Sequence, residues 1–269
     1  MESPVDSQPP PRTPRQLLGP LTNPIHPPMT KLLIDADFFL YRAVQSSELE
    51  LEFNPDCTVI TGDFKHAQGM FKRNLKDLTT RFDTQDILLC FTDRVNFRKT
   101  VDPSYKGNRV KRKPAGYSKA KTWAMDTYPS IIMPTLEADD VLGILATRGD
   151  LTDFVLVSPD KDMEQVPCRL YNLKNEFTQT PELAERKLYE QALTGDSTDG
   201  YKGCPGVGPK RAGILLDKCK GNYWSAVLEA FEEAGQSEKE ALTSIRLAKI
   251  LHHSDWDAEA QTPILYTPQ

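Results

Sequence analysis

The 269-residue sequence contains no uninterrupted apolar run near the roughly 20 residues that a membrane-spanning helix needs. Its five cysteines are odd in number, widely spaced and without a C-x-x-C pair, which argues against a disulfide framework or a zinc knuckle. The four histidines form no metal-site pattern, because His252 and His253 are adjacent and cannot share a helical face. These absences predict a protein with no membrane partner in a reducing compartment, the cytoplasm.

The first 29 residues differ in composition from the rest of the chain. They hold nine of the 21 prolines and little apolar content, which predicts a disordered tail. They lack the apolar stretch of a signal peptide, and the acids Glu2 and Asp6 argue against a transit peptide.

Short apolar runs alternate with helical patterns from residue 31 onward, which is typical of a parallel α/β sheet flanked by helices. The pattern predicts strands at 31–37, 86–93, 130–135 and 153–160, and helices at 64–82 and 137–148. The stretch "SELELEFN" is expected to lead into a helix or an irregular connection. We therefore divide the chain into a tail at 1–29, an α/β core at 30–181 and a mostly helical part at 182–269.

The net charge of −5 does not suggest a nucleic-acid partner, but the distribution of charge does. Residues 94–121, here called the basic segment, contain ten Lys or Arg and one acid, Asp102. Connections longer than about 12–15 residues in a compact domain are usually functional or disordered. The interleaved Phe97, Tyr105 and Tyr117 favour a nucleic-acid contact over a solvated loop, because exposed bases stack on flat rings.

Acidic residues follow the ends of all four predicted strands. They are Asp35, Asp93, the trio Glu137, Asp139 and Asp140, and the pair Asp160 and Asp162. Acids are common in the first turn of a helix, so one such residue alone would mean little. The carboxyl ends of parallel strands, however, meet at one edge of the sheet, where ligands bind.

A further pair, Asp196 and Asp199 in "LTGDSTDG", is spaced so that both can share a helix face. Carboxylates without histidines or thiols suit hard cations such as Mg²⁺ or Mn²⁺. Two such ions about 3.5–4 Å apart can clamp a phosphodiester for hydrolysis. We expect Glu137 to lie in the irregular entry to its helix, so that it and Asp139 both reach inward.

In five short sequence strings that contain these acids and the basic segment, the chain resembles the 5′-nuclease superfamily of flap endonucleases and phage 5′–3′ exonucleases, most closely the phage enzymes. The matching strings, in family order over roughly residues 31–220, are "LLIDAD", "FTDRVNFRKTVDPSYKGNR", "LEADD", "SPDKD" and "TGDSTDGYKGCPGVGPKRAGILL". The resemblance implies a PIN-like α/β fold with a flexible basic arch. It also implies two divalent ions and hydrolysis from 5′ ends, in DNA replication and recombination.

The resemblance also implies residue roles. The first metal group is Asp35, Asp93, Glu137, Asp139 and Asp140, and the second is Asp160, Asp162, Asp196 and Asp199. The arch residues that meet the scissile phosphate and the unpaired end are Arg98, Tyr105, Lys106 and Arg109, followed by the DNA contacts Lys111, Arg112 and Lys113. Many relatives have glycine where this chain has Ala36, which leaves the role of Asp37 open.

The stretch "KGCPGVGPKRAGILL" suggests a phosphate contact of its own. Gly203, Gly206 and Gly208 allow positive φ and close backbone approach, and a helix then opens with Lys210 and Arg211 near its start. In the family this is a helix–turn–helix-like element that grips duplex DNA, often with a monovalent cation such as K⁺ at the 202–212 turn. The alternative is an ordinary Gly-Pro turn between helices.

The expected substrates are double-stranded DNA with 5′ ends or flaps, and RNA–DNA hybrids, acted on by a monomer in the cytoplasm of a host cell if the gene is of phage origin. One alternative is a haloacid-dehalogenase-like phosphatase, although Phe38 and Phe39 stand where that family has threonine. The other is a non-catalytic DNA-binding module. The balance of exonuclease, flap and RNA-primer (ribonuclease H-like) cleavage stays open.

Overall fold

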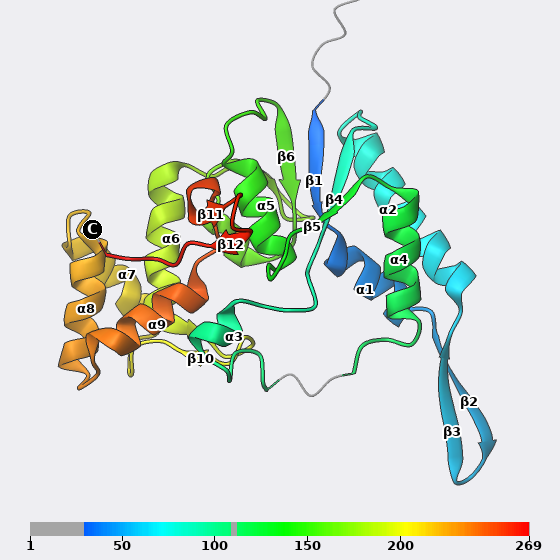
Figure 1. Cartoon of the computed structure of the whole chain (residues 1–269), viewed down its shortest axis with the longest axis horizontal. Helices are drawn as coiled ribbons and strands as arrows, with labels where there is room; N and C mark the ends of the chain where they lie inside the picture. The colour runs from blue at the N-terminus through cyan, green and yellow to red at the C-terminus, as the bar shows by residue number, and fades with distance from the viewer. Residues whose placement is uncertain (1–29, 109–111, 269) are drawn as a thin grey trace, which may run out of the picture.

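The computed structural model describes residues 30–108 and 112–268. Its centre is a six-stranded sheet in the order β5-β4-β1-β6-β7-β8 (Figure 1). The strands are β1 (Lys31–Asp35), β4 (Ile87–Phe91), β5 (Ser130–Ile132), β6 (Phe154–Val157), β7 (Arg169–Tyr171) and β8 (Glu176–Thr178). All neighbours pair in parallel except β7 and β8. The predicted parallel α/β core is confirmed.

Helices cover both faces of this sheet. The helices of this part of the chain are α1 (Ala36–Gln45), α2 (Phe64–Arg81), α3 (Arg98–Val101), α4 (Tyr117–Thr127), α5 (Ala138–Ala146) and the 3-10 helix η2 (Lys161–Gln165). Helices α1, α2 and α4 lie on one side of the sheet and α5 on the other (Figure 1). Strand β1 is buried on both faces, as expected of a central parallel strand. Leu32 and Ile34 pack towards α1, α2 and α4, and Leu33 packs towards α5.

The C-terminal part packs as a helical group with its own core beside α6. Its elements are α6 (Pro181–Thr194), β9 (Gly195–Asp196), β10 (Tyr201–Lys202), α7 (Pro209–Lys218), α8 (Tyr223–Glu233), α9 (Glu238–Ala248), η3 (His253–Asp255), β11 (Trp256–Asp257) and β12 (Thr262–Pro263). The mostly helical character expected after residue 181 is confirmed. None of the described helices is long and apolar enough to cross a membrane.

The expectation for residues 47–54 was wrong. They form β2 (Glu48–Asn54), which pairs with β3 (Cys57–Gly62) in an antiparallel hairpin that projects from the body (Figure 1). Leu49, Leu51 and Phe53 alternate with glutamates and stay exposed, so the period of two is that of a strand. The predicted tail at 1–29 lies outside the described residues.

Sheet topology brings three strand ends together. From β1 the chain first adds β4 and then β5 on one side of the sheet, and afterwards adds β6, β7 and β8 on the other side. The strand order therefore reverses at β1. In open parallel sheets ligands bind beyond the carboxyl ends of the strands at such a reversal. In this chain the edge carries Asp35 at the end of β1, Thr92 just after β4 and Asp160 shortly after β6.

Candidate active site

Seven of the nine acids predicted to bind metal line one cavity of about 760 Å³ at the carboxyl edge of the sheet. They are Asp35, Glu137, Asp139, Asp160, Asp162, Asp196 and Asp199. Asp35 ends β1, and its carboxylate caps α1 by accepting a bond from the Phe38 amide at 3.2 Å. Glu137 occupies the extended N-cap position of α5, with φ −81° and ψ 161°, so its expected place in the entry to the helix is confirmed.

The acids of the cavity are close enough to repel one another. Burial, together with the charges of Asp37 and Asp160, raises the pKa of Asp35 to about 7. Burial, followed by the charges of Asp35 and Asp160, raises the pKa of Asp139 well above its usual range. Burial and Asp160 likewise raise the pKa of Asp162 to about 6. Such a site concentrates negative charge that bound cations would neutralise.

The donor set fits hydrated divalent cations. No group of three or more His, Cys, Asp or Glu side chains within residues 30–108 and 112–268 is arranged as a ready-made cage for an ion. Mg²⁺ rarely needs such a cage, because it keeps several waters and is held through one or two carboxylates. Asp162 Oδ1 is buried without a hydrogen-bond partner, as a ligand oxygen awaiting a cation would be.

Asp140 and Arg98, predicted as metal ligand and phosphate contact, are bound to each other in this structure. The two side chains form a buried, bidentate pair with distances of 2.7 and 2.8 Å. Arg98 also donates to the Leu247 and Lys249 carbonyls, so its guanidinium ties α5 to the end of α9. An arginine that is 2% exposed and satisfied in this way cannot reach a phosphate without breaking a buried pair.

Asp93, also predicted as a metal ligand, is placed apart from the other acids. It lies outside the carboxylate cavity and lines a neighbouring one. Its Oδ1 accepts the Arg94 amide at 2.7 Å and its Oδ2 the Thr135 amide at 2.8 Å. The hydrogen bond from the Thr135 amide, helped by that from Arg94, holds the pKa of Asp93 below its usual range. Since Thr135 has a φ of 62°, the carboxylate supports a strained turn just before Glu137.

Tyr105 and Lys106 reach the carboxylates from the basic segment. The Tyr105 hydroxyl lies 2.9 Å from a Glu137 oxygen and 2.8 Å from an Asp199 oxygen, and its single proton can be donated to either carboxylate. Lys106 pairs with Glu137, and its Nζ lies 3.4 Å from Asp199. Burial alone would raise the pKa of Glu137, but the charges of Arg98 and Lys106 outweigh it and lower the pKa to about 2. The two predicted acid groups are thus bridged by side chains of the basic segment.

The aromatic rings of the basic segment are not arranged to stack on bases. Phe97, Tyr105 and Tyr117 are 4%, 2% and 6% exposed, so their faces are covered by protein. The nucleic-acid contact expected of the segment stays a prediction. Phe97 packs into the core beside α5, and Tyr117 into the core formed with α1 and α2. The rings therefore anchor both ends of the segment.

A second cavity of about 1030 Å³ adjoins the first and shares Asp37, Thr92 and Glu137 with it. Its cations include Arg94, Arg112, Lys113 and Lys121. Arg112, predicted to contact DNA, is held by Glu48 of the hairpin, with Nη1 to Oε1 at 2.6 Å. Arg109 and Lys111, predicted to contact phosphate and DNA, lie outside the described residues.

The glycine-rich turn is only partly as predicted. Gly206 has a φ of 73°, and a Cβ on Gly203 would lie 2.3 Å from the Leu193 carbonyl oxygen. Gly208 needs neither freedom, since its φ is −94° and a Cβ at this position would meet no other atom within 4 Å. Helix α7 begins at Pro209 as expected, with Lys210 and Arg211 exposed.

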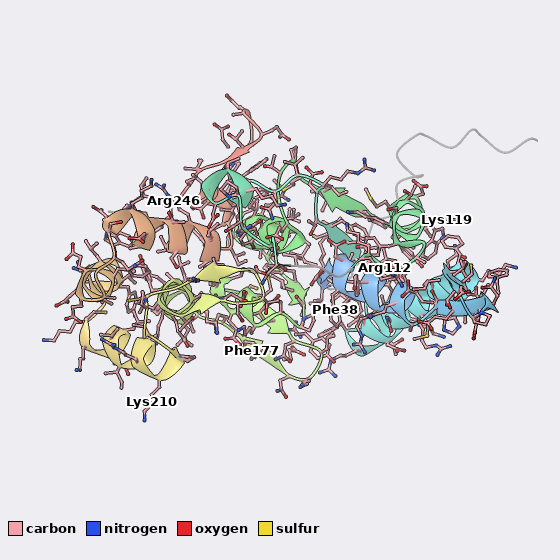
Figure 2. All side chains as sticks on the ribbon, turned by 90° about the horizontal axis from the view of Figure 1, so that it is seen from below. Phe38, Arg112, Lys119, Phe177, Lys210 and Arg246 are labelled. Carbon is pink, nitrogen blue, oxygen red and sulfur yellow. The ribbon has the colours of Figure 1, made fainter. Side chains whose placement is uncertain are left out.

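Figure 2 shows Lys210 and Lys119 at opposite ends of the face onto which the carboxyl edge opens, with Phe38 and Arg112 between them. Helices α6 and α7 are separated by a connection that contains β9 and β10. A helix–turn–helix-like DNA grip at this point stays a prediction.

Two residues that support the site were not predicted from the sequence. Thr92 and Ser158 are the first residues after β4 and β6. The Ser158 hydroxyl donates to Asp35 at 3.1 Å, and Thr92 Oγ1 accepts the Ala138 amide at 3.0 Å. Their shared position, directly after neighbouring parallel strands, is the signal that could have found them.

Comparisons with known proteins identify the family of this chain. A family model described as 5′-3′ exonuclease, N-terminal resolvase-like domain, matches residues 30–192. The exodeoxyribonuclease of Enterobacteria phage T3 is 28% identical over 283 residues, which cover 88% of this chain and 93% of that protein. The flap endonuclease Xni of Shewanella pealeana is 30% identical over 204 residues, which cover 70% of this chain and 76% of that protein.

A solved structure of the bacteriophage T5 flap endonuclease, in a pseudo-enzyme–product complex with DNA and metal ions, shares the fold. Its TM-score is 0.55 at 16% sequence identity, over 82% of this chain and 89% of that one. The family model alone covers more than half of the sequence. The chain therefore belongs to the 5′-3′ exonuclease family and is a nuclease.

Proposed function

We propose that this nuclease hydrolyses DNA from free 5′ ends, with cleavage of 5′ flaps and of RNA in RNA–DNA hybrids as further activities, and that it requires Mg²⁺ or Mn²⁺. The observation that carries the proposal is the carboxylate cavity at the strand reversal, with Lys106 placed against its acids. The named activities of the phage T3 and Shewanella relatives support the choice of DNA ends and flaps.

Two ions are proposed, one for each group of acids. Asp35, Glu137 and Asp139 would hold the first, and Asp160 with Asp162, Asp196 and Asp199 the second. When bound, such ions activate water and stabilise charge on the leaving oxygen. Ser158 holds Asp35 in place for this task by its hydroxyl bond.

The residues of the chain itself hold and orient the phosphodiester. A cavity of acids repels a polyanion, so the incoming phosphate needs a protein cation near the acids. Arg42, Arg98, Lys106 and Lys161 line the cavity. Arg98 is held by Asp140, whereas Lys106 contacts acids of both groups, Glu137 and Asp199. Tyr105 would orient Glu137 and Asp199, because its hydroxyl lies within hydrogen-bond distance of both carboxylates and shares one proton between them. We therefore assign Lys106 to the reacting phosphate and Tyr105 to positioning the acids.

Duplex DNA is proposed to lie across the carboxyl edge, between the glycine-rich turn and the second cavity. Lys210 and Arg211 at the start of α7, with Gly203 and Gly206, would contact the backbone at one end. Arg112 and Lys113 would do so at the other, Arg112 after exchanging Glu48 for a phosphate. Such contacts would bind DNA without reading its sequence.

The remaining parts of the proposal concern conditions and setting. A monovalent cation such as K⁺ would be held by carbonyl oxygens at the 202–212 turn. The protein would act as a monomer in the host-cell cytoplasm during DNA replication and recombination. All five cysteines are free thiols, which suits a reducing compartment.

The test compares three 5′-labelled substrates, a blunt duplex, a duplex with a 5′ flap and an RNA–DNA hybrid, each with Mg²⁺ and with EDTA. We expect Mg²⁺-dependent products that begin at the 5′ end of the duplex and at the base of the flap. Products that begin at 3′ ends, or equal cleavage in EDTA, would contradict the proposal. Release of phosphate from p-nitrophenyl phosphate without DNA cleavage would favour a phosphatase instead.

A further inference from the structure

Asp37 is an acid in the first turn of α1 whose role the sequence leaves open. It lies two residues after Asp35 and lines both the carboxylate cavity and the second cavity. An extra carboxylate beside a crowded set of acids is costly unless its charge is used. Two uses are possible for it, namely ligation of a metal ion or organisation of the surrounding backbone.

Both carboxylate oxygens of Asp37 are already occupied by protein donors. Its Oδ2 accepts the backbone amide of Thr92 at 2.7 Å, and its Oδ1 accepts the hydroxyl of Tyr117 at 2.5 Å. Tyr117 is the first residue of α4, where the basic segment rejoins the core, and its ring is buried. Asp37 therefore joins the end of β4 to the C-terminal root of the basic segment.

Thr92 extends this connection in two directions. Its carbonyl oxygen accepts the ammonium of Lys121, on α4, at 2.6 Å. Its side-chain Oγ1 accepts the amide of Ala138 at 3.0 Å, and Ala138 stands between Glu137 and Asp139. A continuous chain of hydrogen bonds thus runs from α4, through Asp37 and Thr92, to the backbone that carries two acids of the cavity.

The other end of the basic segment reaches the same acids by a different route. Tyr105 and Lys106 contact Glu137 directly. Both limbs of the segment that would face DNA are therefore tied to the start of α5. Rigid connections of this kind set the distance between a bound phosphate and the reacting groups, and a misplacement of about 1 Å can cost about 10²-fold in rate.

We propose that Asp37 is a positioning residue, not a metal ligand. By holding Tyr117 and Thr92, it keeps the C-terminal root of the basic segment in register with Glu137 and Asp139. This inference rests on the proposed function, because it assigns the segment to the DNA that is cleaved.

The two roles predict opposite results for Asp37→Asn. An asparagine can keep both connections, with Oδ1 accepting the Thr92 amide and Nδ2 donating to the Tyr117 hydroxyl oxygen. A metal site that needs the negative charge would lose a ligand in the same variant. Asp37→Ala removes both connections, and Tyr117→Phe removes one of them while leaving the carboxylate in place.

The experiment measures four quantities for the wild type and the variants: the single-turnover rate on a 5′-labelled duplex, the KM for that DNA, Mg²⁺ binding by calorimetry, and the melting temperature. Tyr128→Phe, at the other end of α4, is the matched control for loss of a tyrosine hydroxyl. We expect Asp37→Ala to lower the single-turnover rate about 10–100-fold. Tyr117→Phe should lower it less, and Asp37→Asn and Tyr128→Phe should stay near the wild type. Mg²⁺ binding should be unchanged in all four.

Three results would overturn the inference. Weakened Mg²⁺ binding in Asp37→Asn, with a rate as low as that of Asp37→Ala, would make Asp37 a ligand. A wild-type rate for folded Asp37→Ala would mean that Asp37 contributes to the stability of the fold but not to the positioning of the reacting groups. Equal losses in Tyr117→Phe and Tyr128→Phe would show a general effect on α4. Failure of the proposed function is distinguishable from all three, since the wild-type protein would then show no Mg²⁺-dependent cleavage.

Discussion

Replacement of Lys106 by alanine should slow the chemical step more than it weakens DNA binding. Lys106 pairs with Glu137 and lies 3.4 Å from Asp199, so its ammonium stands among the acids. Unit charges at 3.4 Å interact by about 1 kcal/mol in water and about 5 kcal/mol at an effective dielectric of about 20. Loss of one placed donor to a developing charge typically costs about 10²–10³ in rate, or about 2.7–4 kcal/mol of activation free energy. That energy falls between the two values for the charge pair.

The assay is single-turnover cleavage of a 5′-labelled duplex at saturating protein and Mg²⁺, with the Kd for the same DNA measured in Ca²⁺. We expect the rate of Lys106→Ala to fall about 10²–10³-fold and its DNA affinity to change less than about tenfold, since it is one of many phosphate contacts. Lys31→Ala is the matched control, because Lys31 also pairs with an acid, Asp86, but at the opposite edge of the sheet. Similar rates for the two variants would refute a special role of Lys106 at the reacting phosphate.

Three further predictions concern the stability of the fold and the binding of DNA. Arg98→Met leaves Asp140 buried without its partner, so its free energy of unfolding should fall by about 3–5 kcal/mol in denaturant titration; a loss below about 1 kcal/mol would contradict the buried pair. Burial lowers the pKa of His252 below 6.5, so the unfolded chain binds the proton more readily and stability should fall as the pH drops through and below 6.5. His252→Gln should flatten that part of the profile of stability against pH. An unchanged profile would argue against His252 as the group whose protonation lowers stability. Gly206→Val combined with Lys210→Ala should weaken duplex binding more than the rate at saturating DNA, and wild-type affinity should fall steeply with salt for any sequence.

The sequence predicted the carboxylate cavity because its geometry follows from topology. Acids at the ends of parallel strands converge wherever those strands are neighbours, and seven of the nine acids predicted to bind metal line one cavity. Asp140 and Asp93 could not be separated from the others by type or spacing. Their hydrogen-bond partners are distant in sequence, the Arg98 guanidinium for Asp140 and the Thr135 amide for Asp93, and only the folded chain brings them near.

The basic segment shows the same limit. Interleaved cations and rings predicted a surface for bases, but Phe97, Tyr105 and Tyr117 are buried anchors. Charge density indicates that a segment faces a polyanion, yet it does not indicate which side chains pack inward. The β2–β3 hairpin was a different kind of error, because the alternation of Leu49, Leu51 and Phe53 with glutamates already had the period of a strand.

The most direct test of the account measures Mg²⁺-dependent release of nucleotides from the 5′ end of a labelled duplex by the wild type, Asp139→Ala and Asp160→Asn. Both acids line the carboxylate cavity, and the charge of Asp160 helps to raise the pKa of Asp139. Since each acid is repelled by its neighbours, its removal should not lower the melting temperature. We expect both variants to stay folded and bind DNA but to lose cleavage. Near-normal turnover by either variant would contradict the assignment of this cavity as the hydrolytic site.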